Sequence, residues 1–223
     1  MNRSRVLPVA VSLTAAAALL LTGCGGGDDK DSGDKIAGAG DGKKKESPSA
    51  SASSGAKIDR PDIKLPSDLK LTVKDPNLSD PDQSAAWNDA RNYTQSIAYG
   101  IVKQDAEGAA YKFYSEYGGP SFVYAKDQIK KNIAAGFTIT GERSIENVTA
   151  KTITKHKNVV VTFCTDDTKY FSKEVKTKKV HQTKPSVKDY SFWQVSMKAA
   201  KSNKGLWRAD RIKVEANAQQ CKG

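Results

Sequence analysis

The sequence has few of the residues on which enzyme catalysis most often depends. It contains two histidines, His156 and His181, and both lie in lysine-rich segments, where we expect solvated side chains rather than general bases. No serine lies in a Gly-x-Ser-x-Gly context. Three cysteines without a Cys-x-x-Cys pair are too few for a thiolate metal site. The sequence therefore carries no catalytic signature, and we predict no catalytic residue, no cofactor and no metal site.

Long apolar runs are also scarce. One run covers residues 6–21, and no later run approaches the length of a membrane-spanning helix. Arg3 and Arg5 precede this run, and small residues follow it. A basic start, a short apolar core and small residues at the exit are typical of a secretory signal peptide. We therefore predict that residues 1–23 are a signal peptide.

The end of this segment, Leu21-Thr22-Gly23-Cys24, resembles the lipobox of bacterial lipoproteins. The resemblance implies that the thiol of Cys24 receives a diacylglyceryl group and that its amine is acylated, with palmitate as a typical chain. Two or more acyl chains hold a protein firmly on a bilayer, whereas one does not. The expected location is the extracytoplasmic face of the bacterial cell membrane. The alternative is a plain signal peptide with an incidental cysteine.

Positive charge is concentrated beyond residue 56. Residues 1–24 carry +2 and residues 25–56 carry −1, so residues 57–223 hold +10 of the formal net charge of +11. This balance favours anionic partners such as lipid headgroups, phosphate-bearing cell-wall polymers or acidic envelope proteins. Nucleic acid is a poor candidate and we predict none as a partner, because an exported protein seldom meets it and the sequence shows no nucleic-acid-binding motif.

We predict that residues 24–56 consist of the lipidated Cys24 followed by a flexible tether. Glycine, serine and charged residues dominate the segment, which cannot bury enough apolar surface to fold. Its root-mean-square span is about 30 Å. With Cys24 lipidated, Cys164 and Cys221 remain, and an even pair in an exported chain indicates a disulfide. The alternative is two free thiols.

We expect residues 57–223 to form a single domain. Prolines punctuate 57–79, which indicates an extended chain or an edge strand. Asp80, Pro81 and Gln83 form a helix-start pattern, and apolar residues three and four apart extend the helix to about Gln104. The patterns then predict helices at 109–116 and 121–135 and strands at 144–154, 159–164, 190–199 and 206–215.

Three finer expectations concern the strands. The polar residues 165–168 are predicted to end the strand before them, as a turn. Residues 169–188 are predicted to form an exposed hairpin or long loop. In the last strand the apolar residues change parity, which indicates a β-bulge near Asp210.

Helices followed by antiparallel strands indicate an α+β domain with N-terminal helices packed in the concavity of a curved sheet. This order resembles the NTF2-like (SnoaL-like, cystatin-like) cone fold, in which a Gly-x-Trp turn opens a late strand, and Gly205-Leu206-Trp207 fits that turn. The chain also resembles a group of actinobacterial lipoproteins that share the lipobox, the tether, a Cys-x-Asp at Cys164 and a cysteine near Cys221. That group brings no activity to carry over.

Cone folds commonly hold an apolar pocket between helix and sheet. Trp87, Tyr93 and Trp193 are our candidates for ligand binding there, with core filling as the alternative. Asp89 and Asp105 are available for the acid–base role that SnoaL-like enzymes give to an aspartate. Asp166 and Asp167 offer a cation site or, alternatively, plain turn chemistry.

These observations favour a membrane-anchored lipoprotein that binds a small ligand or a protein partner in the cell envelope without catalysis. One alternative is a SnoaL-like enzyme acting on a small apolar substrate in the cone. Another is electrostatic adhesion to anionic wall polymer through residues 151–184, where nine lysines face three acids. An enzyme requires a pocket with convergent polar groups and a shifted pKa, whereas a binding module predicts a filled cone or a purely apolar pocket. The sequence predicts no oligomeric state.

Overall fold

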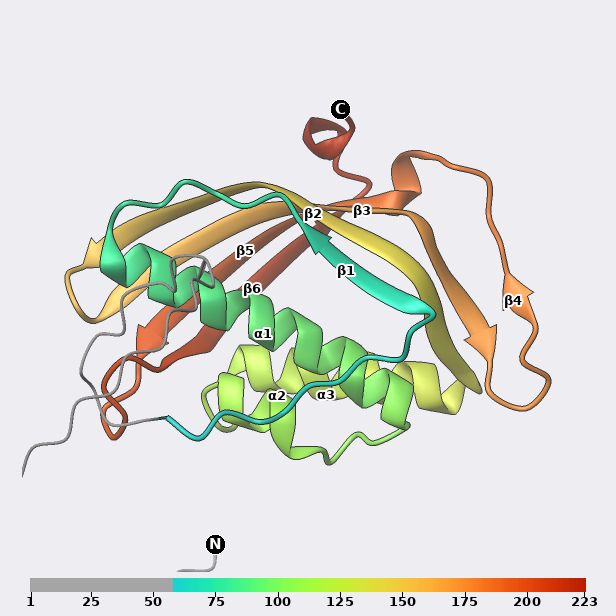
Figure 1. The fold of residues 1–223 in the computed structure, drawn as a ribbon, viewed down its shortest axis with the longest axis horizontal. Helices are drawn as coiled ribbons and strands as arrows, with labels where there is room; N and C mark the ends of the chain where they lie inside the picture. The colour runs from blue at the N-terminus through green and yellow to red at the C-terminus, as the bar shows by residue number, and fades with distance from the viewer. Residues whose placement is uncertain (1–57) are drawn as a thin grey trace, which may run out of the picture. The chain divides into compact units, whose positions relative to one another are not determined.

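The computed structural model describes residues 58–223, which form an α+β domain with helices on one face of a curved sheet (Figure 1). The elements are β1 (Leu69–Val73), α1 (Pro81–Lys103), α2 (Ala109–Tyr114), α3 (Pro120–Ala134), β2 (Phe137–Thr154), β3 (Asn158–Glu174), β4 (Val180–His181), η1 (Val187–Asp189), β5 (Tyr190–Ala199), β6 (Trp207–Ala216) and η2 (Gln219–Cys221). The predicted α+β class is confirmed. The predicted signal peptide, Cys24 and the tether lie outside the described residues.

The sheet has the order β1-β2-β3-β5-β6, and β4 pairs with the outer part of β3. β1 runs parallel to β2 at the edge, which confirms the edge strand predicted within 57–79, and the other neighbours are antiparallel. Within residues 58–223, no helix combines the length and the apolar content that crossing a bilayer requires.

Helix α1 begins and ends where its sequence predicts. The Asp80 carboxylate accepts a hydrogen bond from the Gln83 N–H at 3.0 Å, and Pro81 occupies the first turn. Gln104 ends the helix in the left-handed conformation. One face of the helix is buried against the sheet, including Ala86, Trp87, Ala90, Tyr93, Ile97 and Ile101. Burial of this stripe fixes α1 as the element around which the sheet curves.

The prediction of a break at 165–168 is wrong, because β3 continues through these residues to Glu174. Two side-chain contacts hold the segment in the strand. The Trp193 Nε1–H donates to Thr165 Oγ1 at 3.2 Å, and Asp167 pairs with Arg143 of β2. Tertiary contacts outweigh the turn preference of these polar residues. Of the two forms predicted for 169–188, the hairpin is found, because the end of β3 pairs antiparallel with β4.

Two features bend the β2–β3 hairpin over α1. Gly141 has φ +97°, and a Cβ there would lie 2.0 Å from the Lys169 carbonyl oxygen, so only glycine fits. Next to it, β2 advances two residues from Glu142 to Ser144 while β3 advances three, from Asp166 to Lys169. The extra residue on β3 is a bulge, which increases the local twist and redirects side chains.

The C-terminal part of the chain closes against the sheet. The bulge predicted near Asp210 is confirmed, because Ser196 pairs with Arg211 and the next residue, Met197, pairs with Ala209. A disulfide joins Cys164 of β3 to Cys221 of η2, with Cα atoms 5.4 Å apart. The two cysteines are 57 residues apart in the sequence. In the loop-entropy model, a disulfide that closes a loop of this length stabilises the folded state by about 4 kcal/mol.

Candidate functional site

A cavity of about 190 Å³ lies between the helices and the concave face of the sheet. Ile97, Ala98 and Ile101 of α1 contribute to one wall, and α3 adds Tyr124, Gln128 and Asn132. The sheet supplies the rest of the lining: Ile139, Arg143, Tyr170, Phe171, Ser172 and Trp193. Apolar, aromatic and polar groups therefore converge on one small space. The filled or purely apolar interior expected of a binding module is not found, because Arg143 and its polar neighbours line the cavity.

Arg143 is the cation of this cavity. Its Nε and Nη2 atoms donate to the two carboxylate oxygens of Asp167, both at 2.6 Å. The side chains are 15% and 21% exposed, so the pair is largely withdrawn from water. A guanidinium has five N–H groups, and the remaining three form no hydrogen bond within residues 58–223. Arg143 is thus charge-balanced yet keeps unused donors.

Aromatic rings hold the guanidinium from its faces. It lies 4.3 Å from the ring centroid of Tyr170 and 6.0 Å from that of Trp193. Trp193 in turn stacks on Phe163 at 5.6 Å and meets Tyr124 edge-on at 6.0 Å. Because the rings are packed against one another, the charge is held in one place, as a binding site requires.

Three titratable groups of the cavity have pKa values raised above their ordinary values, further from neutral pH. Burial raises the pKa of Tyr170 to about 12 and also raises the pKa of Tyr124. The pKa of Arg143 is raised as well; burial acts to lower it, but the charge of Asp167 and its hydrogen bonds with Arg143 outweigh that effect. These groups hold their protons at neutral pH and act as hydrogen-bond donors rather than as bases.

The aromatic residues predicted from the sequence fall into two groups. Trp193 lines the cavity, whereas Trp87 and Tyr93 do not. Trp87 packs edge-on against Phe163 in the core, and its buried Nε1–H has no hydrogen-bond partner in the described residues. The Tyr93 hydroxyl donates to the Ser121 carbonyl at 2.6 Å, joining α1 to α3. Trp87 and Tyr93 therefore support the core beside the cavity.

Asp89 is fully buried and lies away from the cavity, beneath the extended strap of residues 58–68. Its carboxylate pairs with Arg60 of the strap and accepts the Trp207 backbone N–H at 2.8 Å. Burial raises the pKa of Asp89, against the opposing effects of the Trp207 N–H and Arg60. Asp89 thus joins the strap, α1 and β6.

The histidines and the remaining aspartates also lie outside the cavity lining. His156 is 72% exposed and pairs with Asp82, and His181 pairs with Glu174. Asp166 and Asp167 are strand residues, so the interpretation of plain turn chemistry is wrong. Among residues 58–223, no group of three or more histidine, cysteine or acidic side chains is arranged to hold a metal ion.

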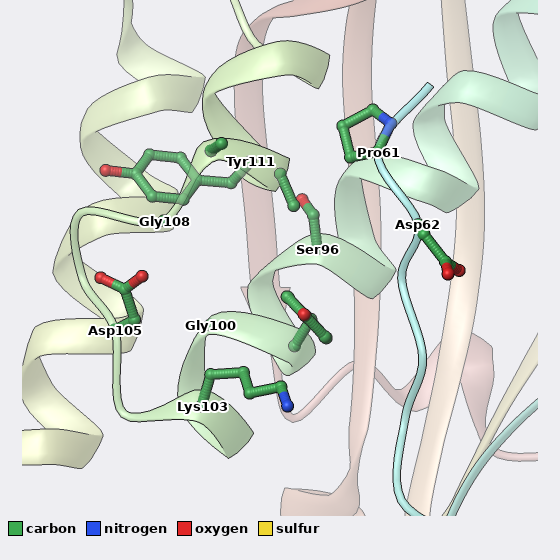
Figure 2. Close-up of a pocket in the computed structure, with 11 residues that line it drawn as sticks. Pro61, Asp62, Ser96, Gly100, Lys103, Asp105, Gly108 and Tyr111 are labelled. Carbon is green, nitrogen blue, oxygen red and sulfur yellow. The ribbon is translucent and has the colours of Figure 1, made fainter. Parts of the chain in front are cut away.

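A second, larger cleft of about 440 Å³ lies between the strap and the helices (Figure 2). Figure 2 shows Pro61 and Asp62 of the strap on one side and Asp105 and Tyr111 on the other. Its polar groups are used locally: Asp105 accepts the Glu107 N–H at 2.8 Å, and the Ser96 hydroxyl donates to the Tyr93 carbonyl at 2.6 Å. The smaller cavity is therefore the better candidate site.

Two residues of the cavity, Arg143 and Tyr170, were not predicted from the sequence. The signal for Arg143 is its parity, because Ile139, Gly141, Arg143 and Ile145 alternate along β2, so a cation occupies an otherwise apolar or small face. Tyr170 follows a segment interpreted as a turn, and no pattern placed it on the same face as Trp193. Both residues become visible only when β2 and β3 are paired.

No protein-family model matches the sequence, and the curated proteins include no match. Among solved structures, the chain is similar to a ketosteroid isomerase-like protein from Erwinia carotovora atroseptica, with a TM-score of 0.37 and 10% sequence identity. The match covers 61% of this chain and 97% of that one.

Proposed function

We propose that the protein is a lipid-anchored envelope lipoprotein whose domain binds a small ligand in the cavity around Arg143. The observation that carries the binding role is the Arg143–Asp167 pair, which places unused N–H donors against aromatic rings in a largely buried space. Burying such a pair is unfavourable unless its geometry is well satisfied. A ligand that accepts hydrogen bonds from Arg143 gives partners to the N–H groups that Asp167 leaves unused.

The chemistry of the cavity limits the ligand. Asp167 already balances the charge of Arg143, so the preferred ligand is neutral and carries a hydrogen-bond acceptor such as a carbonyl oxygen. Trp193 and Tyr124 offer flat apolar surfaces, which suit a planar or cyclic body. A cavity of about 150 Å³ holds a benzene molecule, so the volume of about 190 Å³ fits one ring with a polar substituent.

The pKa values support binding rather than proton transfer. General acid–base catalysis works best when a group in the site has a pKa near the working pH. Tyr170, at about 12, is far from it. The convergent polar groups and the raised pKa of Tyr170 are features that we expected of the alternative, a SnoaL-like enzyme acting in the cone. That alternative also requires a base, and the described lining contains neither a carboxylate nor a histidine.

Ligand binding is tested on the mature chain, residues 24–223, carrying Cys24→Ser so that it is soluble without lipid. Saturation-transfer NMR with cyclohexenone as a neutral cyclic carbonyl is expected to show binding, and benzoate of similar size to bind more weakly. Ala98→Leu adds volume inside the cavity and is expected to abolish the cyclohexenone signal. An unchanged signal in Ala98→Leu, or none in the parent chain, contradicts the binding role.

Tyr170→Phe and Tyr117→Phe form a matched pair for the same experiment. Each removes one phenolic hydroxyl, but Tyr170 lines the cavity while Tyr117 is 86% exposed. We expect cyclohexenone affinity to fall about fivefold in Tyr170→Phe, the equivalent of one ordinary hydrogen bond. Tyr117→Phe is expected to bind like the parent chain.

The anchor is tested separately from the cavity. Mass spectrometry of the mature N-terminus is expected to show a lipidated Cys24, and Cys24→Ala is expected to leave the membrane fraction. An unmodified Cys24, or a Cys24→Ala chain that stays with the membrane, contradicts the lipoprotein assignment and leaves the binding role to be judged by the cavity experiments.

A further inference from the structure

Apart from Lys169, which pairs with Glu142 within the strands, the lysines of residues 151–184 lie toward the two ends of the long β2–β3 hairpin. The hairpin closes through the turn after Thr154, and its other end lies where Phe137 pairs with Glu174. Lysines 151, 155 and 157 belong to the closed end. Lys176 and Lys184 follow the far end, on either side of β4. A docking surface would therefore combine the lysines of one end with the residues of the neighbouring segments.

At the closed end, a second turn joins the first. The Ala199 N–H donates to the Lys157 carbonyl at 2.9 Å, which places the β5–β6 turn beside the β2–β3 turn. The two turns and their flanks enclose a groove of about 720 Å³. Lys157, Lys198, Lys201 and Arg208 contribute its cations, and Glu116 is its one acidic residue among the described lining.

The surrounding segments reinforce this positive charge. Residues 147–165 and 190–209 contain no aspartate or glutamate. Among residues 58–223, Lys198 pairs with Asp210 at 3.5 Å, while Lys157 and Lys201 form no ion pair. We call the exposed lysines 151, 155, 157, 198, 201 and 204, together with the half-buried Arg208, the basic end of the domain. Cations outnumber the acids beside them, which are Glu116, Asp210 and the Asp82 that pairs with His156. Such an excess of positive charge attracts anionic surfaces.

An exposed apolar side chain lies within the basic end. Ile153 is 58% exposed and lies near the end of β2, between Lys151 of that strand and Lys155 of the turn that follows it. An apolar residue flanked by cations is the arrangement found at the bilayer interface, where the apolar group enters the headgroup boundary and the cations meet lipid phosphates. A soluble wall polymer offers phosphates but no apolar layer for Ile153.

The described chain also begins at this end. Gly205 of the β5–β6 turn lies beside the Ile58 side chain, and the Gly205 carbonyl accepts a hydrogen bond from Arg60 at 3.4 Å. Figure 1 shows the first described residues next to the β5–β6 turn, on the same side of the domain as the β2–β3 turn. The segment that precedes residue 58 therefore joins the domain at its basic end.

We propose that the basic end docks on the anionic phospholipid surface of the membrane, with Ile153 entering the interface. The proposal rests on the lipid anchor of the proposed function, which keeps this end near the bilayer. Docking gives the domain a second, electrostatic attachment and a fixed orientation. Each lysine near an anionic surface contributes about a fivefold gain in binding.

The test separates docking from anchoring by using the mature chain with Cys24→Ser, which carries no lipid. Sedimentation with vesicles of equal parts phosphatidylglycerol and phosphatidylcholine is expected to pull down the chain, and vesicles of phosphatidylcholine alone are not. Lys157→Glu with Lys201→Glu is expected to weaken binding at least about 25-fold. Raising the salt to 0.5 M is expected to release the chain.

The control pair is Lys176→Glu with Lys184→Glu, which makes the same change in net charge beside β4. It is expected to sediment like the parent chain, and an equal loss in both pairs overturns the proposal. Ile153→Ser is expected to weaken vesicle binding without affecting retention on soluble polyphosphate. The proposal is also overturned if the chain binds polyphosphate as tightly as vesicles and Ile153→Ser changes neither. The surface would then bind an anionic polymer instead of a membrane. Cyclohexenone binding by each variant reports separately on the cavity and on folding.

Discussion

Two arginine–aspartate pairs in this domain use the same chemical groups for different purposes. In the first, Asp89 is fully buried while the Arg60 side chain is 34% exposed, and the carboxylate is further occupied by the Trp207 N–H. In the second, Arg143 and Asp167 are 15% and 21% exposed, and the arginine keeps unused N–H groups. In the first pair, the protein supplies further hydrogen-bond partners to both groups. In the second, Arg143 lines a cavity and has N–H groups free to bind a ligand there.

The difference teaches how to separate a structural ion pair from a binding one. The Asp89 carboxylate is fully buried, and Arg60 and the Trp207 N–H already use both of its oxygens. An arginine fixed by one bidentate partner and by aromatic faces has both a defined position and free donors. Both arginines keep unused N–H groups, but Arg60 is 34% exposed and can donate to water, whereas Arg143 is 15% exposed and lines a cavity.

The largest expected effect is that of Asp167→Ala. This change leaves the Arg143 charge largely buried without its partner and is expected to lower the free energy of unfolding by about 3 kcal/mol. Urea unfolding followed by circular dichroism measures the loss. Asp127→Ala, on the exposed face of α3, is the control and is expected to change stability by less than about 0.5 kcal/mol.

Asp89→Ala is expected to lower the free energy of unfolding by about 2 kcal/mol. The Trp207 N–H loses its acceptor inside the protein, but Arg60 turns toward water because part of its side chain is already exposed. The measurement is again urea unfolding, with the exposed Asp59→Ala as the control. A loss greater than that of Asp167→Ala would remove the distinction between the two pairs.

Replacing both members of the cavity pair sharpens the comparison. Arg143→Met with Asp167→Leu removes two charges together, and its stability is expected to stay within about 1 kcal/mol of the parent chain. Cyclohexenone binding is expected to disappear, because the N–H donors are gone. A stable double variant that still binds cyclohexenone contradicts the role of Arg143 as the ligand's donor.

The smallest effect concerns pH. Tyr170 has its pKa raised from 10.0 to about 12 in the folded protein, so the stability it contributes is complete below pH 10 and is lost as the pH rises toward 12. At pH 10.5 this loss is about 0.8 kcal/mol, and Tyr170→Phe is expected to lack it. Urea unfolding at pH 8 and pH 10.5 measures the difference, with Tyr117→Phe expected to behave like the parent chain.

The sequence predicts the elements whose causes are local. The cap at Asp80, the apolar stripe of α1 and the parity change at Asp210 each depend on residues within one or two turns, and all three are found in the structure. The pairing of Cys164 with Cys221 follows from counting cysteines and is also found. Short-range patterns therefore suffice for the layout of the domain.

The candidate site depends on register, which short-range patterns do not contain. Arg143 meets Asp167 because a bulge on β3 and the bend at Gly141 bring together strands whose residues are 24 apart. Polar residues at 165–168 prefer turns, but pairing with β2 and β5 and the contacts with Arg143 and Trp193 keep them in a strand. Of the aromatic candidates, Trp193 alone lines the cavity, since its position on β5 is fixed by pairing with Phe163.

The strap of residues 58–68 has a mechanical consequence. Arg60 is the first described side chain to form an ion pair with the body of the domain, and β1 begins only at Leu69. A pull applied through residue 58 therefore loads the Arg60–Asp89 pair before any hydrogen bond of the sheet. We expect this ion pair to break first under tension, before the force reaches the hydrogen bonds of the curved sheet that surrounds the cavity.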